Sequence, residues 1–493
     1  MKDKIMNLLK KVFTFVKNKI DSIRDKSGNK QIVHLTYLFT FIFVALIVYI
    51  SLFLAFDKDK FINNSYNPRE EIFASKVVRG SILSRDGDVL AYTDKVGDSE
   101  YRRYPYSNAF AHVVGYNTKG KQGMELSDSF TMLSSSMLIT EKLENEAMGN
   151  KNLGDNIIST LDLETQLEAY YAMSNFRGAV VMMNAKTGQI IALVSKPDFD
   201  PNSINENWES INADASSSVL LNRATQGLYP PGSTFKIVTA LEYINEHNGY
   251  DGYDFDCKGS FEYKGSVINC YHGSSHGDVD FEKSFAKSCN ASFANITTTL
   301  NKGGFANMCS ELLFGQELPC PINVKKSYVP INTKSTVDEL MQTGIGQGKT
   351  QITPYHMCLI SAAIANNGVL MKPYLVDRVE NANGDVIKTT KPQEYKRIIS
   401  QENATYLHKL MRDVVLSGTA SRIKDTPNYI AYGKTGSAEY SSDKSLSHAW
   451  FSGFAEGDND EVIAISVIVE NGGSGGEIAV PIAKRIFNTY FAQ

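Results

Sequence analysis

Three short segments of the chain place serine, lysine, asparagine and threonine side chains at spacings that suit nucleophilic catalysis. In the first, residues 228–236 (LYPPGSTFK), Pro-Pro-Gly ends one element and the apolar run KIVTALEYI continues with helical periodicity. Residues i and i+3 share a helix face, so Lys236 is expected beside the hydroxyl of Ser233. A neutral lysine can take the serine proton, and a helix N-terminus stabilises developing negative charge. The segment predicts Ser233 as nucleophile and Lys236 as its base.

The setting separates this segment from other matches to Ser-x-x-Lys. Four more begin at Ser27, Ser284, Ser421 and Ser441, but none has the Pro-Pro-Gly lead and the apolar helix behind it. A pattern this short matches by chance, so only Ser233 is retained.

The second segment is Ser288-Cys289-Asn290, which begins 55 residues after Ser233 within residues 281–296, a stretch with a helical pattern. The tripeptide Ser-x-Asn also occurs at Ser203 and Ser210. Position and helical setting, rather than the tripeptide itself, make Ser288 and Asn290 candidates.

The third segment, residues 433–437 (GKTGS), follows directly after the predicted strand 429–432. A strand edge can bind an extended peptide through main-chain hydrogen bonds, while Lys434 and Thr435 can hold a carboxylate. The same Lys-Thr-Gly sequence at residues 186–188 lies in a hairpin turn, where these residue types need no functional explanation.

Hydrophobic periodicity predicts the elements that must position these segments. Residues 178–183 and 189–194 flank an Asn/Gly turn and predict a β-hairpin, and a helix is expected from Asp162. Helical patterns dominate residues 205–425. Later elements are predicted as strands at 429–432, 449–454 and 462–469 and a helix at 482–491. Strands at both ends enclose a helical middle, so we expect the two sets to share one sheet.

The N-terminal region indicates a membrane anchor. Residues 35–56 carry no charge and are about long enough to cross a bilayer as a helix. A core helix or a cleaved signal peptide is the alternative, but the run is too long for a signal and lacks a small-x-small cleavage site. Residues 1–30 carry nine Lys or Arg and three Asp, which predicts a cytoplasmic N-terminus. The tail itself is expected as either an amphipathic helix on the inner leaflet or a solvated, partly ordered segment.

Length and composition limit the remaining possibilities. For a chain of 493 residues two or more domains are expected, and a composition of 42% hydrophobic and 21% charged residues is ordinary for a globular protein. The net charge of −4 gives no reason to expect nucleic-acid binding. Residues 57–155 are polar, and the turn at 84–88 between two short apolar runs predicts a hairpin there.

Taken in order, the three segments resemble the three signatures of penicillin-binding proteins and serine β-lactamases. Further segments resemble class B transpeptidase domains at residues 178–180, 196–202, 344–348, 353–354 and 449–451. Others resemble the class B pedestal domain at residues 79–82, 85–87 and 123–125. No segment similar to a glycosyltransferase precedes them, so we expect class B rather than class A.

The resemblance implies an α/β (α+β) transpeptidase fold, with a central antiparallel sheet and helices on both faces. The expected organisation is a cytoplasmic tail at 1–34, an anchor at 35–56, a β-rich dimerisation-like pedestal at 57–155 and a transpeptidase domain at 156–493. The catalytic domain would lie outside the cell membrane.

The resemblance also implies the chemistry. Ser233 would attack the penultimate D-Ala carbonyl of a peptidoglycan stem peptide, with Lys236 as base. Ser288 would relay a proton to the leaving amine, and Asn290 would orient Lys236 and the substrate. The substrate-binding residues would be Lys434, Thr435, Gly436 and Ser437, with the N–H groups of Ser233 and Ser437 as oxyanion hole. β-Lactams would acylate the same serine, and no cofactor is required for the chemistry.

A metal site is also predicted. Cys257, Cys270, His276 and Cys289 form C-x12-C-x5-H-x12-C, with ligand types and a ligand number that suit a closed zinc site. The spacing is looser than in a zinc ribbon, but some elongation-type class B enzymes resemble this chain here and bind structural zinc. The alternatives are a Cys257–Cys270 disulfide, free buried thiols, and His272 in place of His276.

Other functions remain open on the sequence. A β-lactamase or β-lactam sensor of related fold would share the three signatures, although neither needs the pedestal. A non-enzymatic scaffold for wall synthesis is the third possibility. For the transpeptidase, the resemblance implies the cytoplasmic membrane and a polytopic glycan polymerase as partners.

Overall fold

The computed structural model describes residues 30–54, 69–97, 99–214, 217–424, 426, 428–439 and 447–493, together with the single positions 14 and 18. These residues fall into two units, Met1–Asn67 and Pro68–Gln493. Nearly all of the basic tail, for which an amphipathic helix or a solvated segment was expected, lies outside the described residues, as do Ser27 and Ser441.

The first unit contains the apolar helix α2 (Lys30–Leu52). Its segment Gln31–Leu52 is long and apolar enough to cross a membrane, and all of its residues except Val33 are exposed or half-buried. Large apolar side chains such as Phe41 and Ile47 are mostly exposed, which is unlike the core helix kept as an alternative. The helix begins five residues before the predicted start, and residues 55–56 lie outside the described part.

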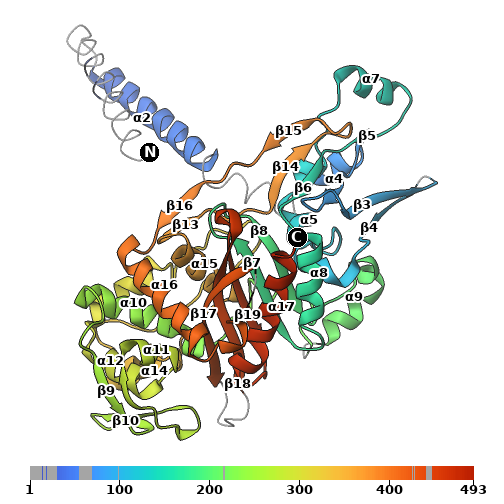
Figure 1. The fold of residues 1–493 in the computed structure, drawn as a ribbon. Helices are drawn as coiled ribbons and strands as arrows, with labels where there is room; N and C mark the ends of the chain where they lie inside the picture. Colours follow the sequence, from blue (N-terminus) through green and yellow to red (C-terminus); the bar gives the residue numbers. More distant parts are fainter. Residues whose placement is uncertain are drawn as a thin grey trace. The chain divides into compact units, whose positions relative to one another are not determined.

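The core of the second unit is a five-stranded antiparallel sheet in the order β17-β18-β19-β7-β8 (Figure 1). Its strands are β7 (Gly178–Asn184), β8 (Ile190–Lys196), β17 (Tyr429–Glu439), β18 (Ser447–Gly457) and β19 (Val462–Val469). Strands β19 and β7 pair from Ile463↔Asn184 to Val469↔Gly178, so the two ends of the transpeptidase region share one sheet as predicted. Every residue of β19 is buried, as expected for a central strand.

Helices cover both faces of this sheet. On one face, α8 (Leu163–Ala172) and α17 (Val480–Tyr490) pack against each other and against the sheet. The predicted start of α8 is confirmed, because the Asp162 carboxylate caps it by accepting a hydrogen bond from the N–H of Thr165 at 2.7 Å. On the other face, α15 (Pro354–Ala365) contacts β7, β18 and β19 and is buried along its whole length.

A second sheet has the order β15-β14-β6-β2-β3-β4. Its strands are β2 (Ile82–Leu83), β3 (Val89–Val96), β4 (Ser99–Arg103), β6 (Asn156–Ser159), β14 (Val376–Glu380) and β15 (Val386–Thr389). The β2–β3 pairing confirms the hairpin predicted around residues 84–88. Strands β14 and β15 come from a region predicted as mainly helical, so residues 376–389 complete a sheet that begins near residue 82.

The sequence prediction missed several short strands inside residues 205–425. They are β9 (Asp254–Cys257), β10 (Ser260–Tyr263), β11 (Ser266–Asn269), β12 (Gly277–Asp280), β13 (Val369–Met371) and β16 (Glu394–Arg397). Each has three or four residues, and most of their side chains are exposed or half-buried. Such strands carry no long apolar alternation, which is the signal on which strand prediction depends.

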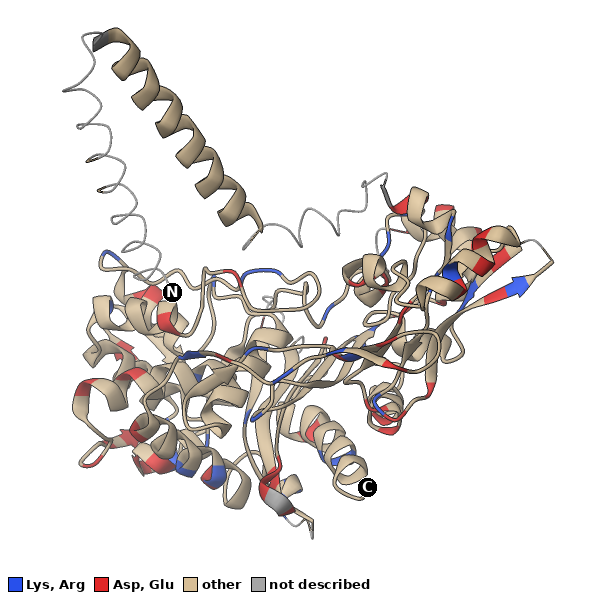
Figure 2. Ribbon diagram, turned by 90° about the horizontal axis from the view of Figure 1, so that it is seen from above, with Lys and Arg blue, Asp and Glu red and all other residues tan. Residues whose placement is uncertain are grey.

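Charged residues are interspersed along the second unit (Figure 2), but Glu125 is fully buried near β2 and β3. Glu125, in α5 (Gly123–Ser127), accepts hydrogen bonds from Nε of Arg79 and Nε of Arg102, each at 2.7 Å. Burial alone would raise the pKa of Glu125, but the two guanidinium groups lower it overall. The cluster ties β4 to α5 and to the segment before β2.

Replacing Glu125 by Ala leaves two arginines buried without their shared partner. We expect the free energy of unfolding to fall by about 3–5 kcal/mol, measured by urea denaturation. Glu100→Ala is the matched control, because its ion pair with Lys151 at 2.9 Å is partly exposed and contributes about 1 kcal/mol or less. Equal losses for the two variants would contradict a structural role for the buried cluster.

Candidate active site

Ser233 lies on a tight turn that presses against the central sheet. The turn η4 (Gly232–Phe235) is a 3-10 helix, and α10 (Lys236–His247) continues from it, so Ser233 precedes the α-helix rather than starting it. Gly232 has φ +52°, and a Cβ at this position would lie 3.0 Å from Ala438 of β17. Glycine therefore permits the close approach that sets the serine hydroxyl beside the strand.

Lys236 is fully buried directly after this turn. Its Nζ donates to the carbonyl of Ser288 at 2.7 Å and to Oδ1 of Asn290 at 2.7 Å, and lies 3.3 Å from Oγ of Ser288. Burial lowers the pKa of Lys236 to about 7, against the opposing influence of Cys289 and Cys270. Among the described residues no carboxylate contacts this amine. Near neutral pH it is therefore available as a proton acceptor.

The structure corrects the helical prediction around Ser288. The stretch forms two helices, α11 (Phe281–Ala286) and α12 (Asn290–Thr299), and Ser288 sits between them with φ +58°. Cys289 caps α12, because its Sγ accepts a hydrogen bond from the N–H of Ser292 at 3.4 Å. The break lets Ser288 direct both its carbonyl and its hydroxyl at Lys236, which a continuous helix would prevent.

Lys434 and Thr435 lie in the middle of β17, not at its end as predicted, because the strand continues to Glu439. Lys434 is fully buried and donates from Nζ to Oγ of Ser288 at 2.8 Å. Burial, followed by repulsion from Lys236, lowers the pKa of Lys434 well below its usual range. The hydroxyl of Ser288 thus lies between two lysine amines.

These segments open into a cavity of about 850 Å³. The predicted residues on its wall are Ser233, Ser288, Asn290, Thr435 and Ser437, while Lys236 and Lys434 are buried behind them. Gly436 stands in β17 between Thr435 and Ser437, and a Cβ there would lie 2.9 Å from the carbonyl oxygen of Pro231. The structure therefore brings all three segments to one site.

Thr419 and Gln347 also line the cavity, and neither was predicted as a site residue. Thr419 and Thr435 share a hydrogen bond of 2.5 Å between their hydroxyls. Gln347, from the 344–348 segment noted only for its resemblance, lies on the same wall. The one signal for Thr419 was its place in a Ser-Gly-Thr turn between a helix and a strand.

Of the rejected matches, Ser421 and Lys287 line the same cavity, whereas Ser284 and Lys186 do not. Ser284 accepts a hydrogen bond from Ser292, while Lys287, the lysine of that match, donates to the carbonyl of Ser417. Lys186 pairs with Asp460 in the turn between β7 and β8, as its hairpin setting predicted.

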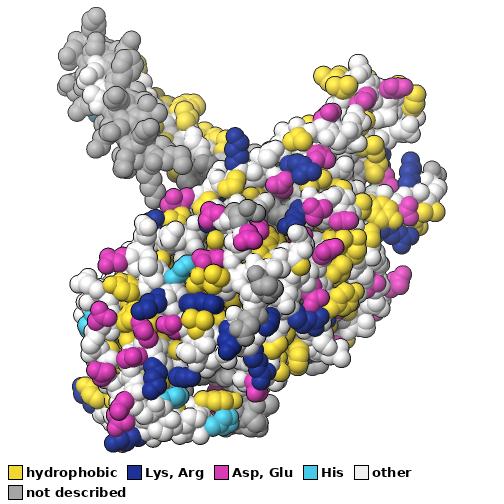
Figure 3. Space-filling model, in the orientation of Figure 1, with side chains coloured by type: hydrophobic (Ala, Val, Ile, Leu, Met, Phe, Trp, Pro, Cys, Tyr) yellow, Lys and Arg dark blue, Asp and Glu magenta, His cyan; other side chains and the backbone are white. Residues whose placement is uncertain are grey.

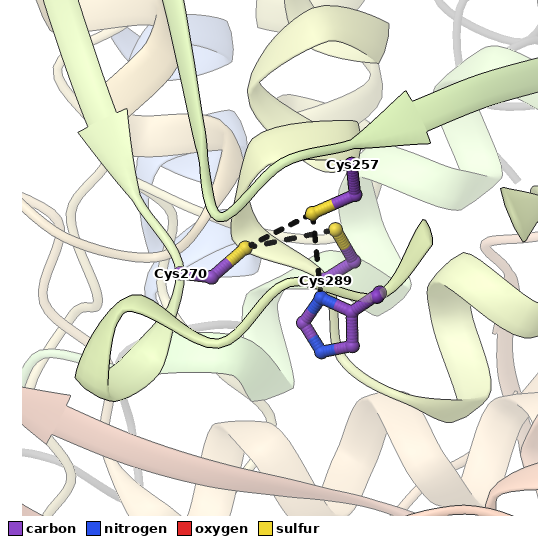
Figure 4. Close-up of side chains that lie close together, drawn as sticks. Cys257, Cys270 and Cys289 are labelled. Carbon is purple, nitrogen blue, oxygen red and sulfur yellow. Dashed lines mark hydrogen bonds between the residues drawn. The ribbon is translucent and has the colours of Figure 1, made fainter. Parts of the chain in front are cut away.

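Cys257, Cys270, His276 and Cys289 converge behind the Ser288 loop (Figure 4). The Sγ–Sγ distances are 3.7 Å for Cys257–Cys270 and 3.7 Å for Cys270–Cys289, and Cys257 Sγ lies 3.4 Å from Nδ1 of His276. All six cysteines are free, so the Cys257–Cys270 disulfide is not formed. His272 is outside this group, and its side chain is exposed.

The donor set fits a tetrahedral metal ion. Zinc–sulfur bonds of about 2.3 Å at tetrahedral angles place two sulfur atoms about 3.8 Å apart, close to the observed separations. The four donor atoms lie within 4.8 Å of one another, and the three sulfur atoms are buried. The hydrogen bond with the Cys289 thiol is the main cause that lowers the pKa of Cys270, to about 5.

Comparison with known proteins agrees with this geometry. The profile of the penicillin binding protein transpeptidase domain matches residues 178–488, and that of the penicillin binding protein A dimerisation domain matches residues 79–157. The chain therefore belongs to the penicillin-binding protein transpeptidase family. Within that family it is a class B member, as its sequence predicted.

Individual relatives cover most of the chain. Peptidoglycan D,D-transpeptidase PbpA of Mycolicibacterium smegmatis is 30% identical over 441 residues, which span 82% of this chain and 87% of the relative. Peptidoglycan D,D-transpeptidase MrdA of Acinetobacter baumannii is 29% identical over 446 residues, or 78% of this chain and 65% of that protein. The imipenem acyl-enzyme complex of penicillin-binding protein A from M. tuberculosis superposes with a TM-score of 0.76 at 27% identity, covering 85% of this chain and 100% of that structure.

The pKa of Lys236 can be measured directly. We expect an NMR titration of protein with isotope-labelled lysine Cε atoms to show a signal from Lys236 with a midpoint near pH 7, because burial disfavours the charged amine. The signal should be absent from Lys236→Met, which assigns it. A titration in which every lysine has its midpoint above about 9 would contradict the neutral amine.

Proposed function

We propose that this chain is a membrane-anchored peptidoglycan D,D-transpeptidase that cross-links stem peptides through an acyl-enzyme on Ser233. One observation carries the proposal: three residues after Ser233 stands a buried lysine, whose amine has no carboxylate partner in the described part of the chain and shares the hydroxyl of Ser288 with Lys434 of β17. The activity of the PbpA and MrdA relatives and the acyl-enzyme complexes of the structural relatives support the same reaction.

In the first half-reaction, Ser233 Oγ attacks the penultimate D-Ala carbonyl while its proton passes to Nζ of Lys236. The N–H groups of Ser233 and Ser437 stabilise the oxyanion of the tetrahedral intermediate. The intermediate collapses when the C–N bond breaks. The leaving amine takes its proton through Ser288, whose hydroxyl lies 3.3 Å from the Lys236 amine. Terminal D-Ala departs, and the donor remains as an ester on Ser233.

In the second half-reaction, an amine of a neighbouring stem peptide attacks this ester. Lys236, again neutral, accepts the amine proton by the reverse of the same relay, and Ser233 regains its proton as the new amide forms. Asn290 positions Lys236 in both steps through its 2.7 Å contact.

Lys434 and Thr435 form the proposed site for the terminal carboxylate of the donor. The hydroxyl of Thr435 shares a hydrogen bond with that of Thr419, and Thr435 lines the cavity. The amine of Lys434 is buried behind this wall. The carboxylate of a bound donor would supply a negative counter-charge to the two adjacent buried amines. In a site of low dielectric this attraction is strong and favours donor binding.

β-Lactam acylation of Ser233 is the most direct test of the proposed function. We expect fluorescent penicillin to label the wild-type protein at Ser233, and Ser233→Ala to remove the label completely. Ser210→Ala, an exposed serine from a rejected Ser-x-Asn match, is the matched control and should label normally. Rapid loss of the adduct would indicate the alternative, a β-lactamase. A Ser233→Ala chain that still supports cell growth would indicate a scaffold.

The proposed placement has α2 as a single-pass anchor, a cytoplasmic N-terminus and the catalytic domain outside. The excess of Lys and Arg before the apolar run supports this orientation. We propose domain limits of 57–155 for the pedestal and 156–493 for the transpeptidase, which contributes β6 and the β14–β15 hairpin to the second sheet.

A membrane-embedded glycan polymerase is the proposed partner. Exposed apolar side chains gather on and beside α7 (Ile139–Ala147), above the second sheet (Figure 3). They are Leu138, Ile139, Leu143 and Met148, each at least 60% exposed. A group of this kind is suited to a protein contact.

We further propose that the Cys₃His group holds a structural zinc ion. Cys289 stands between Ser288 and Asn290, so a bound ion would fix the loop that contacts Lys236. Zinc would supply this rigidity and takes no part in acyl transfer.

Metal analysis and thermal unfolding test the zinc proposal. We expect about one zinc per purified chain, and Cys257→Ser should lose it and lower the melting temperature. Cys358→Ser is the matched control, because Cys358 is equally buried but lies outside the cluster and should keep its metal. Wild-type protein with no metal, and no loss of stability on chelation, would contradict the proposal.

A further inference from the structure

The outer edge of β17 is closed beyond Ser437 by a side chain. In the amide orientation that satisfies both groups, Gln347 donates from its nitrogen to the carbonyl of Glu439 at 2.8 Å. Its oxygen accepts a hydrogen bond from the N–H of Glu439 at 3.2 Å. A primary amide that makes this pair of bonds imitates the peptide group of a neighbouring strand.

The register of β17 shows which residues face this edge. Strand β17 pairs with β18 without a break from Tyr429↔Gly457 to Glu439↔Ser447. In an antiparallel pair, main-chain groups of alternate residues point toward and away from the partner, so Thr435, Ser437 and Glu439 point outward together. The carbonyl of Thr435 confirms this direction, because it accepts a hydrogen bond from Nζ of Lys434 at 3.2 Å. Ser437 therefore lies between Thr435, whose carbonyl is bonded to Lys434, and Glu439, whose main chain is bonded to Gln347.

Gln347 is held in place by the loop that supports the nucleophile. The loop follows α14 (Val337–Gly344), and the carbonyl of Gly346 accepts a hydrogen bond from the N–H of Gly232 at 2.9 Å. Gly346 has φ +77°, and a Cβ there would lie 1.9 Å from the carbonyl oxygen of Gly232. The N–H of Gln347 in turn donates to the carbonyl of Gln342 at 2.8 Å. The same loop therefore fixes the turn of Ser233 and the end of the substrate strand.

We infer that Gln347 restricts main-chain recognition of the acyl donor to a single residue, the one opposite Ser437. The inference rests on the proposed function, in which the donor lies antiparallel to β17 with its terminal carboxylate at Lys434 and Thr435. Its penultimate residue is then opposite Ser437, and the residue two positions earlier would be opposite Glu439. The Gln347 amide occupies that position, so the donor leaves the strand edge after its D-Ala-D-Ala end.

This arrangement has a consequence for specificity. Residues before the D-Ala-D-Ala end meet side chains of the cavity wall instead of the strand edge. A plain α-linked extension of the donor therefore gains no main-chain hydrogen bonds, and Gln347 acts as a specificity-determining residue.

Two donors of different length test the inference on the full-length protein. Acetyl-D-Ala-D-Ala reaches only Ser437, whereas acetyl-Gly-Gly-D-Ala-D-Ala is long enough to reach Glu439. We expect the wild-type kcat/KM values for D-Ala release from the two donors to agree within about twofold. In Gln347→Ala the edge is open, and two new main-chain hydrogen bonds should raise the ratio of long to short donor about tenfold, mainly through KM.

Gln347→Glu keeps a side chain of the same length and an oxygen that accepts from the N–H of Glu439, but it loses the donor to the carbonyl of Glu439. Its ratio of long to short donor should lie between those of the wild type and Gln347→Ala. Gln347→Ser is a second opening variant, to be used if Gln347→Ala does not fold, as judged by penicillin labelling. An unchanged ratio in the opening variants would overturn the inference, including the case in which both donors slow equally because Gln347 is only structural. Wild-type protein that neither releases D-Ala nor binds penicillin would instead overturn the proposed function.

Discussion

Two lysine amines buried within reach of one hydroxyl are the constraint on which the site depends. Lys236 and Lys434 are both fully buried, and their Nζ atoms lie 3.3 and 2.8 Å from Oγ of Ser288. Among the described residues no carboxylate contacts either amine. Two positive charges this close together and shielded from water repel each other strongly, so at least one amine must be neutral near pH 7. Burial without a carboxylate counter-ion therefore keeps one amine neutral, and a neutral amine can act as a base.

The surrounding elements hold the two lysine amines and the Ser288 hydroxyl in these positions. The 3-10 turn sets Ser233 against β17, the break before α12 directs Ser288 and Asn290 at Lys236, and the long strand β17 buries Lys434. The Cys₃His group and the loop of Gln347 support the second and third segments from outside. Catalysis needs the amine of Lys236 in one position. Segments more than 200 residues apart in the sequence therefore meet at the start of α10 and at the central sheet.

Much of this could be predicted from the sequence, for identifiable reasons. Long apolar runs gave β7, β8, β18 and β19, and Pro-Pro-Gly before an apolar helix singled out Ser233. The break at Ser288 could not be predicted, because the stretch 281–296 keeps helical spacing and contains no Gly or Pro. Its break depends on tertiary contacts with Lys236 and Lys434 and on an unusual cap by a cysteine sulfur. The exposed strand β15, and the role of Gln347 at Glu439, also depend on partners distant in sequence, which no local pattern reveals.

The central claim is that burial makes Lys236 the base that activates Ser233, and the pH dependence of acylation tests it most directly. The second-order rate constant for acylation of Ser233 by benzylpenicillin should fall about tenfold per pH unit below about pH 7, where the amine becomes protonated, and level off above it. A rate that is constant from about pH 5 to 9, or one that rises only as pH approaches about 10, would contradict a lysine held neutral by its surroundings.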